Sequence, residues 1–384
     1  MSVEQLRAAA VVTPDAVLEP GAVVVEDGVI ADVRPLSPTT AVPSRVLAPG
    51  FVDLQVNGHD DVDVAYAQGE DWDRLDRLLL AQGVTTWCPT LVTAPLESYE
   101  DTLARVTGAA TGPATPTRAH PRPAVAGVHL EGPFLGGAPG AHPRQWLLPL
   151  DGPGLAWLAQ LPETVSVMTL APELEHAPEA IASLAARGVL VALGHSAATY
   201  DEAVAAVDAG ARLVTHLFNG MAPLHHRSPG LVGAALADER VAVSLIADLI
   251  HVHPAVLRAA FLAKGQGRVA LVTDAVAWRA ARVGEVALTM GDDGAPRLAN
   301  ADGTLAGSAL TMDQAVRNCV HACRLPLTAV IDAAATTPAR LLRLSDRGAL
   351  TKGLRADIVA LSTDLQVTSV WIGGDRAWTL EGAE

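Results

Sequence analysis

The sequence predicts an α/β protein, a (β/α)8 TIM-like barrel with a small β-sandwich domain built from both chain ends. Two observations support this prediction. Residues 49–349 contain eight short apolar runs that alternate with segments of helical spacing, a pattern typical of a (β/α)8 barrel. Residues 1–48 and 350–384 instead contain short strand patterns separated by turns, so we expect these two ends to pair into one small domain.

The composition indicates a globular protein with a large core. Half of the 384 residues are hydrophobic and 18% are charged, which provides a large core and excludes a disordered chain. The net charge of −15 opposes binding to nucleic acid or an anionic membrane surface. No apolar run of roughly 18 residues predicts a membrane span, no secretory signal is evident, and three cysteines do not make a disulfide framework. We therefore expect a cytoplasmic protein.

The predicted elements follow in order along the chain. The terminal domain has strands at residues 22–26 and 29–33 around a turn at Asp27-Gly28, and at residues 358–362, 367–372 and 376–379. The barrel strands are predicted at residues 51–56, 84–88, 126–130, 165–170, 189–193, 213–217, 241–246 and 269–273. Helices are predicted at residues 72–82, 98–106, 155–160, 178–187, 201–209, 254–264, 311–323, 327–335 and 338–344, with a hairpin at 286–298.

The strand ends contain many residues of metal-binding type. Active sites of such barrels lie at the C-terminal ends of the strands. The side chains found there include Glu131, Glu173, His195, His216, Asp248 and Asp274. Glu131, His195 and His216 directly follow three of the runs and suit a catalytic divalent metal with an open position for water. His195 alone could equally be a core or capping residue, and only the barrel topology brings the three side chains together.

The polar residues that follow strands one and eight could have functional or structural roles. Asp274 either exchanges protons with a metal-activated water or caps the next helix. Gln55 and Asn57 are poor metal ligands and neither lysine, Lys264 or Lys352, lies near strand four, so we predict one metal rather than two. We expect His59, just beyond strand one, to have a surface role.

A basic cluster after strand six could bind an anion. His225, His226 and Arg227 stand out in an acidic chain, and an arginine can hold phosphate with two parallel hydrogen bonds, although a solvated loop is the alternative. Gly220 could bring backbone N–H groups close to an oxyanion. His129 is expected to be a core residue or to support Glu131.

Taken together, these residues resemble those of the N-acetylglucosamine-6-phosphate deacetylases of the amidohydrolase superfamily. The resemblance covers nearly the whole chain, with the motifs in the family's order. The matching segments are Pro49-Gly50-Phe51-Val52-Asp53, His129-Leu130-Glu131-Gly132-Pro133-Phe134, Gly194-His195-Ser196, Thr215-His216-Leu217-Phe218-Asn219-Gly220-Met221, Pro229-Gly230-Leu231-Val232-Gly233, Asp248-Leu249-Ile250-His251-Val252, Val272-Thr273-Asp274-Ala275 and Gly303-Thr304-Leu305-Ala306-Gly307-Ser308.

The resemblance implies a role for each matching residue. Glu131, His195 and His216 would bind one divalent metal, with zinc expected and iron, cobalt or manganese as alternatives. Asp274 would act as general base and then acid, and His142 would polarise the acetyl carbonyl. The substrate contacts would come from Ala141, His142, Asn219, Gly220, Arg227, His251, Leu305, Ala306 and Gly307. A homodimer is implied, with Arg227 reaching the site across the interface.

The implied reaction is hydrolysis of N-acetyl-D-glucosamine 6-phosphate to D-glucosamine 6-phosphate and acetate. N-acetylgalactosamine 6-phosphate is the close alternative, because the two sugars differ by one hydroxyl epimer. A cyclic-amide or dipeptide hydrolase and a barrel without catalysis are more distant alternatives. Trp278 and Arg279 depart from the small residues expected after Asp274, which leaves the shape of the lid and the sugar preference open.

Overall fold

The barrel prediction is confirmed by the computed structural model, which describes residues 3–111, 121–290, 298–300 and 303–382. Its parallel strands follow one another around the barrel, with the short β11 (Ala124–Val125) beside the second of them. These strands are β7 (Phe51–Val56), β10 (Val84–Val92), β12 (Val128–Glu131), β13 (Val165–Leu170), β14 (Leu190–Leu193), β15 (Leu213–Val214), β16 (Ala242–Ile246) and β17 (Val269–Val272).

The ring closes between its first and last strands, just beyond their ends. The Asp274 N–H donates to the Gln55 carbonyl at 3.0 Å, and the Asn57 N–H donates to the Ala275 carbonyl at 2.8 Å. These bonds bring the polar residues after β7 against those after β17, although more than 200 residues separate them in the chain. The sixth barrel strand, β15, is shorter than the predicted range 213–217, because the backbone at His216 leaves the extended conformation with a φ of 30°.

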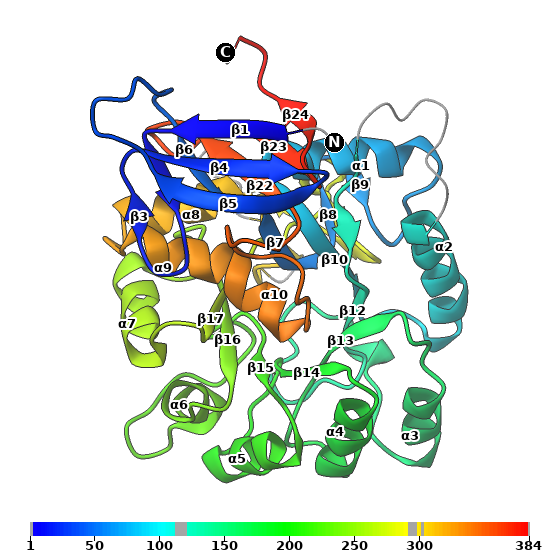
Figure 1. The fold of residues 1–384 in the computed structure, drawn as a ribbon. Coiled ribbons are helices and arrows are strands. Elements are labelled where there is room, and N and C mark those ends of the chain that lie inside the picture. The colour runs from blue at the N-terminus through cyan, green and yellow to red at the C-terminus, as the bar shows by residue number, and fades with distance from the viewer. Residues whose placement is uncertain (1–2, 112–120, 291–297, 301–302, 383–384) are drawn as a thin grey trace.

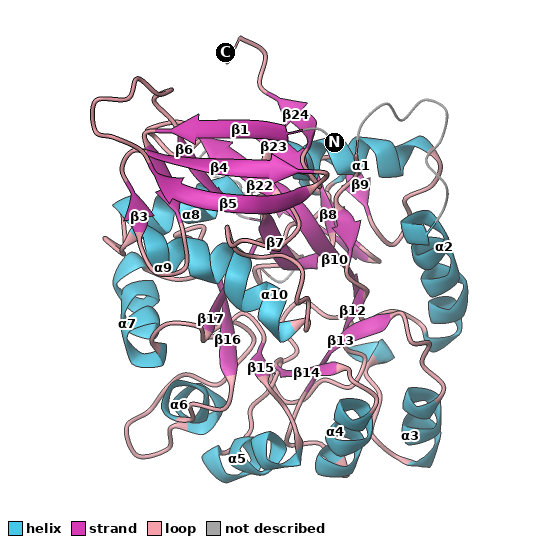
Figure 2. Cartoon of the chain, in the orientation of Figure 1, coloured by secondary structure: helices cyan, strands magenta, loops and turns pink. Residues whose placement is uncertain are grey.

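The helices lie around the outside of the barrel (Figure 2). The described ones are α1 (Glu70–Ala81), α2 (Tyr99–Thr111), α3 (Gly152–Ala159), α4 (Ala177–Ala186), α5 (Tyr200–Ala209), α6 (Gly230–Ala237), α7 (Pro254–Lys264), α8 (Met312–His321), α9 (Leu327–Ile331) and α10 (Thr337–Leu341). Their starts follow local chemistry: Thr199 and Glu202 form a reciprocal capping box at α5, and Pro254 occupies the first turn of α7. A π-helical turn, Asp332–Thr336, joins α9 to α10.

Helix α6 is missing from the sequence-based prediction. Its segment, Gly230–Ala237, consists of glycine, alanine, leucine and valine, and most of it is buried. A helix that is apolar all round has no alternation of polar and apolar faces, so periodicity does not reveal it. Part of the hairpin predicted at residues 286–298 does form, since β20 (Thr289–Met290) pairs with β21 (Leu298–Ala299), but residues 291–297 lie outside the described residues. A smaller pair, β18 (Arg282–Val283) and β19 (Val286–Ala287), precedes it.

Both chain ends build the β-sandwich, as predicted. One layer is β1 (Val3–Ala8), β4 (Gly21–Glu26) and β5 (Val29–Pro35). The other layer contains β24 (Asp375–Thr379), β23 (Val367–Ile372), β22 (Ile358–Leu361), β6 (Val46–Pro49), β2 (Ala10–Val12) and β3 (Val17–Leu18), in that order. Figure 1 shows the blue N-terminal layer lying over the red C-terminal strands.

The register of β22 and β23 divides their side chains between two cores. Ile358, Ala360 and Trp371 pack inside the sandwich, whereas Val359 and Val370 pack into the core of the barrel. Successive residues of a strand point to opposite faces, so this one sheet is buried on both sides and fastens the sandwich to the barrel. We propose residues 1–48 and 350–384 as one domain and 49–349 as the other.

A short hairpin after the first barrel strand is buried against a distant segment of the chain. His59 was expected at the surface, and that expectation is wrong: it lies in the hairpin of β8 (Gly58–His59) and β9 (Val62–Asp63) and is buried, which lowers its pKa. The hairpin folds under the 277–284 segment, where the Arg279 N–H donates to the Asp60 carbonyl at 2.7 Å. In the described part of the chain, no helix has the length and apolar character needed to cross a bilayer.

Candidate functional site

A cavity of about 290 Å³ opens at the C-terminal ends of the barrel strands. All but one of the site residues predicted from the sequence line it: Glu131, Ala141, His142, His195, His216, Asn219, Gly220, His251, Asp274, Leu305, Ala306 and Gly307. Asn57 belongs to the same lining. Arg227 does not line the cavity; it is exposed, and its Nη1 lies 2.8 Å from His226 Nε2.

The ends of β12, β14 and β15 bring one carboxylate oxygen and two imidazole nitrogens together. Glu131 Oε1 lies 3.1 Å from His195 Nε2 and 2.9 Å from His216 Nε2, and the two nitrogens are 3.1 Å apart. All three side chains are buried. Ligand atoms around a tetrahedral Zn²⁺ with bonds of about 2.0–2.1 Å lie about 3.3 Å apart, so this triangle has the size that a small divalent cation requires.

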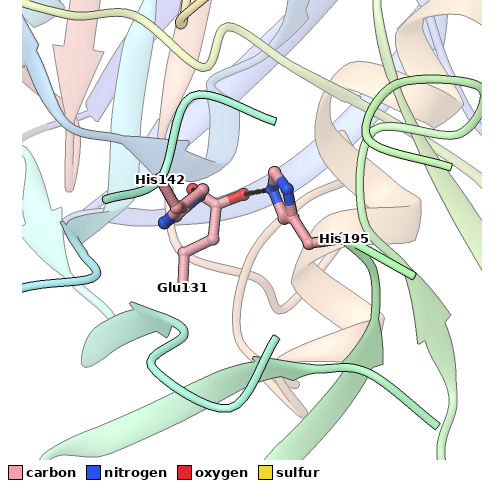
Figure 3. A group of neighbouring side chains, drawn as sticks. All are labelled: Glu131, His142 and His195. Atoms are coloured by element: carbon pink, nitrogen blue, oxygen red, sulfur yellow. Dashed lines mark hydrogen bonds and ion pairs between the residues drawn. The ribbon is translucent and has the colours of Figure 1, made fainter. Parts of the chain in front are cut away.

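A second, overlapping group could also hold a metal ion. Ligand atoms of Glu131, His142 and His195 all lie within 4.8 Å of one another, and Figure 3 shows these side chains pointing toward each other. The shorter contacts favour His216 over His142 as the third ligand, because His142 Nε2 is 3.9 Å from the nearest oxygen of Glu131.

Hydrogen bonding suits His142 to a different task. The Thr93 N–H donates to its Nδ1 at 3.4 Å, and Thr93 Oγ1 lies 2.9 Å from the same nitrogen. A nitrogen that accepts a backbone N–H carries no proton, so the ring proton is on Nε2. Burial, followed by the charge of His195, lowers the pKa of His142 to about 3. His142 is therefore a neutral ring that offers one N–H to the cavity.

The electrostatics of Glu131 favour its charged form. Burial raises the pKa of this carboxyl, but the hydrogen bonds and charges of His195 and His216 outweigh burial and hold the pKa well below its usual range. The reverse holds for His216: burial lowers its pKa, yet the bond to Glu131 raises it overall. A permanently ionised carboxylate with two imidazoles is the donor set that zinc, iron and cobalt accept.

Asp274 faces this cluster through two amides. Gln55 Nε2 donates to Glu131 Oε1 and to Asp274 Oδ1, both at 3.0 Å, and Asn57 Nδ2 donates to the same Asp274 oxygen at 2.7 Å. The Gln55 amide therefore bridges the two carboxylates, whereas the Asn57 amide donates to Asp274 alone. Burial, and then the negative charge of Glu131, raise the pKa of Asp274 to about 7.

The backbone around the site adopts an uncommon conformation. His195, His216 and Asp274 have φ angles of 51°, 30° and 48°. Such conformations cost about 1–3 kcal/mol each and persist where surrounding structure enforces them. Gly220 lets its backbone lie close to the His195 ring, because a Cβ at this position would lie 2.8 Å from His195 Nδ1.

Glu173 also follows a barrel strand, but the structure gives it another role. Its Oε1 accepts the N–H groups of Gly137 and Ala197 at 2.9 and 2.7 Å, and its Oε2 accepts the Ser196 hydroxyl at 2.6 Å. Glu173 therefore ties together the loops that carry His142 and His195. Sequence reasoning missed this function, and that of Thr93, because neither residue differs locally from a surface polar residue.

Part of the cavity lining is apolar and was not predicted. It includes Val92, Phe218, Ile246, Val276, Val283 and Val286. Isolated valines give no sequence signal, so only the fold identifies this wall. Trp278 and Arg279 do not line the cavity: Arg279 Nε pairs with Asp60 Oδ1 at 2.8 Å, and Trp278 packs against the apolar cluster that contains Val276.

Comparisons with known proteins agree with this geometry. The profile of the amidohydrolase family matches residues 46–377. The N-acetylglucosamine-6-phosphate deacetylase of Bos taurus is 40% identical over 357 residues, covering 88% of this chain and 85% of that protein. The N-acetylgalactosamine-6-phosphate deacetylase of Escherichia coli O157:H7 is 38% identical and covers 97% and 98% of the two chains.

A solved structure extends the similarity to three dimensions. It is a variant of the Mycobacterium smegmatis N-acetyl-D-glucosamine-6-phosphate deacetylase in complex with N-acetyl-D-glucosamine-6-phosphate. The TM-score is 0.87 at 32% identity, over 99% of this chain and all of that one. The chain belongs to the amidohydrolase family, in the group formed by the N-acetylglucosamine-6-phosphate deacetylases.

Proposed function

We infer that this protein hydrolyses the acetamide of N-acetyl-D-glucosamine 6-phosphate to D-glucosamine 6-phosphate and acetate. The observation that carries this inference is the cluster of Glu131, His195 and His216 opposite Asp274 in one cavity, in a chain whose relatives are deacetylases of this class. Cyclic-amide and dipeptide hydrolases do not need a phosphate-binding group, so dependence on the phosphate separates them from this function.

We propose that Glu131, His195 and His216 hold a single divalent metal, with zinc expected. A metal bound there supplies Lewis acidity and a water that ionises near neutral pH. The amides of Gln55 and Asn57 support one metal rather than two, because Gln55 donates N–H to both Glu131 and Asp274 and Asn57 donates to Asp274. Elemental analysis should give one metal per chain; a value of two would contradict this proposal.

Asp274 and His142 carry the proton and charge transfers in this proposal. As water attacks the acetyl carbon, Asp274 takes its proton, and the same proton then goes to the nitrogen as the C–N bond breaks. The amides of Gln55 and Asn57 hold Asp274 opposite the Glu131 cluster, where it can exchange this proton. The Nε2–H of His142 donates to the carbonyl oxygen, where negative charge develops.

Substitution of Asp274 tests this assignment. In Asp274→Asn the acceptor oxygen for Gln55 and Asn57 remains, so we expect normal folding and metal content but a loss of roughly 10²–10⁴-fold in acetate release. Near-normal turnover by the metal-loaded variant would rule out Asp274 as the base. Parallel assays on the N-acetylglucosamine and N-acetylgalactosamine 6-phosphates decide between the two sugars; the similarity to the Escherichia coli enzyme makes the second sugar the alternative substrate.

We further propose a homodimer in which Arg227 completes the partner's phosphate site. The cavity lining of this chain contains no lysine or arginine among the described residues, whereas Arg227 is exposed on the loop after β15. Coexpression of Arg227→Ala with Asp274→Asn chains tests this. If Arg227 acts across the interface, heterodimers regain one complete site and roughly a quarter of wild-type activity returns. If it acts within its own chain, none returns.

We also propose a cytoplasmic location. The three cysteines Cys88, Cys319 and Cys323 are all unpaired and buried, which is usual in a reducing compartment. Recovery of the protein in the membrane or extracellular fraction of its native cells would contradict this location.

A further inference from the structure

His251 is the histidine of the cavity that takes no part in the Glu131 cluster, and a carboxylate supports it from behind. Asp248 lies two residues after β16, and its Oδ2 is 2.6 Å from His251 Nδ1. Its other oxygen accepts the N–H groups of Ile250 and His251 at 2.9 and 2.8 Å. Both side chains are more than nine-tenths buried.

This arrangement decides which nitrogen of His251 meets the cavity. An ionised carboxylate only accepts hydrogen bonds, so Nδ1 must carry a proton. The hydrogen bond also fixes the rotation of the ring, because Asp248 is itself held by two backbone N–H groups. The Nε2 edge is then the part of the ring left for a ligand, and His251 lines the cavity.

The loop is shaped to hold this pair. Leu249 has a φ of 66°, a left-handed conformation that a leucine rarely adopts and that lets the chain double back so that residues 250 and 251 face the carboxylate. Burial raises the pKa of Asp248, but the hydrogen bonds and charge of His251 lower it overall, so the carboxyl is ionised.

We propose that Asp248 is a positioning residue that orients His251 for binding the phosphorylated sugar. The proposal rests on the function inferred above and adds a residue to it. The hydrogen bond to Asp248 holds the ring in one orientation and leaves its Nε2 edge for the substrate. The described lining residues of this cavity include no lysine or arginine, so the orientation of His251 matters for binding the sugar.

The test is a double-mutant cycle with Asp248→Asn, His251→Ala and the double variant. The Asp248→Asn side chain keeps an acceptor for the two backbone N–H groups but loses the charge that faces Nδ1. We expect Asp248→Asn to raise KM for the phosphorylated sugar roughly tenfold or more with kcat within about threefold. In the His251→Ala background the same substitution should have no further effect. Additive effects, or a loss confined to kcat, would overturn the proposal.

A binding measurement keeps this test separate from the proposed reaction. Calorimetric Kd values for glucosamine 6-phosphate, measured on the same metal-loaded variants, require no turnover. A coupled cycle in Kd with an inactive wild type supports Asp248 and contradicts the deacetylase function. Turnover by the wild type together with an uncoupled cycle in Kd supports the deacetylase function and contradicts the role of Asp248. Asp364→Asn, in an exposed turn, is the matched control and should change neither quantity.

Discussion

The two ends of the barrel carry cavities of opposite character. At the C-terminal end, about 290 Å³ is lined by carboxylates, histidines and valines. At the N-terminal end lies a larger cavity of about 520 Å³, whose lining includes one carboxylate, Glu239, and five arginines: Arg212, Arg240, Arg268, Arg340 and Arg343. In a chain of net charge −15 the second cavity could be mistaken for an anion site.

Hydrogen bonding distinguishes the two cavities. Arg212 donates to the Val207 and Ala211 carbonyls at 2.9 and 2.7 Å, and Arg268 donates to the Lys264 carbonyl at 3.2 Å. Both arginines lie at the C-terminal ends of helices, where a positive charge offsets the helix dipole.

The remaining arginine contacts extend this pattern. Arg340 donates to the Gly267 carbonyl, and Arg240 pairs with Asp208 and Asp238. These guanidinium groups are therefore already bonded to backbone carbonyls or to carboxylates of the chain itself. At the mouth, by contrast, polar atoms converge on one point and leave an open face. The candidate active site is therefore identified by polar side chains that point toward one another, and not by the volume of its cavity.

The largest expected effect comes from a pair of matched carboxylates. Glu131→Gln removes the ionised oxygen that two imidazoles share, so we expect metal content to fall below about one tenth of the wild-type value and activity to fall by roughly 10³-fold or more. Glu239→Gln, in the other cavity, should leave both unchanged. Elemental analysis and acetate release measure the two quantities. Equal effects of the two substitutions would show that the cavity lined by Glu131 is not the metal site.

An intermediate effect, on the pH dependence of stability, is expected from Asp53, a buried acid on barrel strand β7. Burial, partly offset by hydrogen bonds from Thr273 and Gln55, raises the pKa of Asp53 to about 7 from 3.8. Because the folded pKa exceeds the unfolded one, the folded state is favoured at low pH, and this contribution is lost as the pH rises from about 4 to about 7. The full shift corresponds to about 4 kcal/mol.

Asp53→Asn cannot ionise, so its unfolding free energy should fall less than that of the wild type between pH 5 and pH 8. Denaturant titrations at both values measure the difference, and Asp364→Asn serves as an exposed control. Wild-type and Asp53→Asn curves that remain parallel across this range would show that Asp53 is ionised throughout.

The smallest effect is predicted at the N-terminal end. Arg343 lines the larger cavity and is exposed. If that cavity only closes the barrel, Arg343→Ala should leave kcat, KM and the metal content within about twofold of the wild type, since surface substitutions of this kind are close to neutral. A marked change in KM would mean that the two ends of the barrel communicate.

Much of the fold follows from patterns that the chain shows locally. Strand β13 at Val165–Leu170 and helix α7 at Pro254–Lys264 have the predicted bounds, because an apolar run bounded by polar residues and a proline at the first helical turn are local signals. Helix α6 lacks any such signal. His59 was placed wrongly, because its burial depends on a segment more than 200 residues away.

The candidate site shows the same limit. Glu131 and Glu173 both follow barrel strands and are equivalent in sequence, yet one faces two imidazoles and the other binds the loops. Asp248 and Asp274 are likewise alike in sequence, and only their partners separate a residue that supports His251 from one that faces the cluster.

The order of apolar runs and turn residues alone determined that this chain forms a barrel with a sandwich made from its two ends, and which residue types lie at the strand ends. The tertiary structure alone decided which of these side chains meet, how Gln55 and Asn57 separate two carboxylates, and which way each histidine presents its nitrogens. The physical reason is that strand periodicity is a local property of the chain. Burial, charge coupling and hydrogen-bond partners instead arise between residues that the closing of the ring brings together.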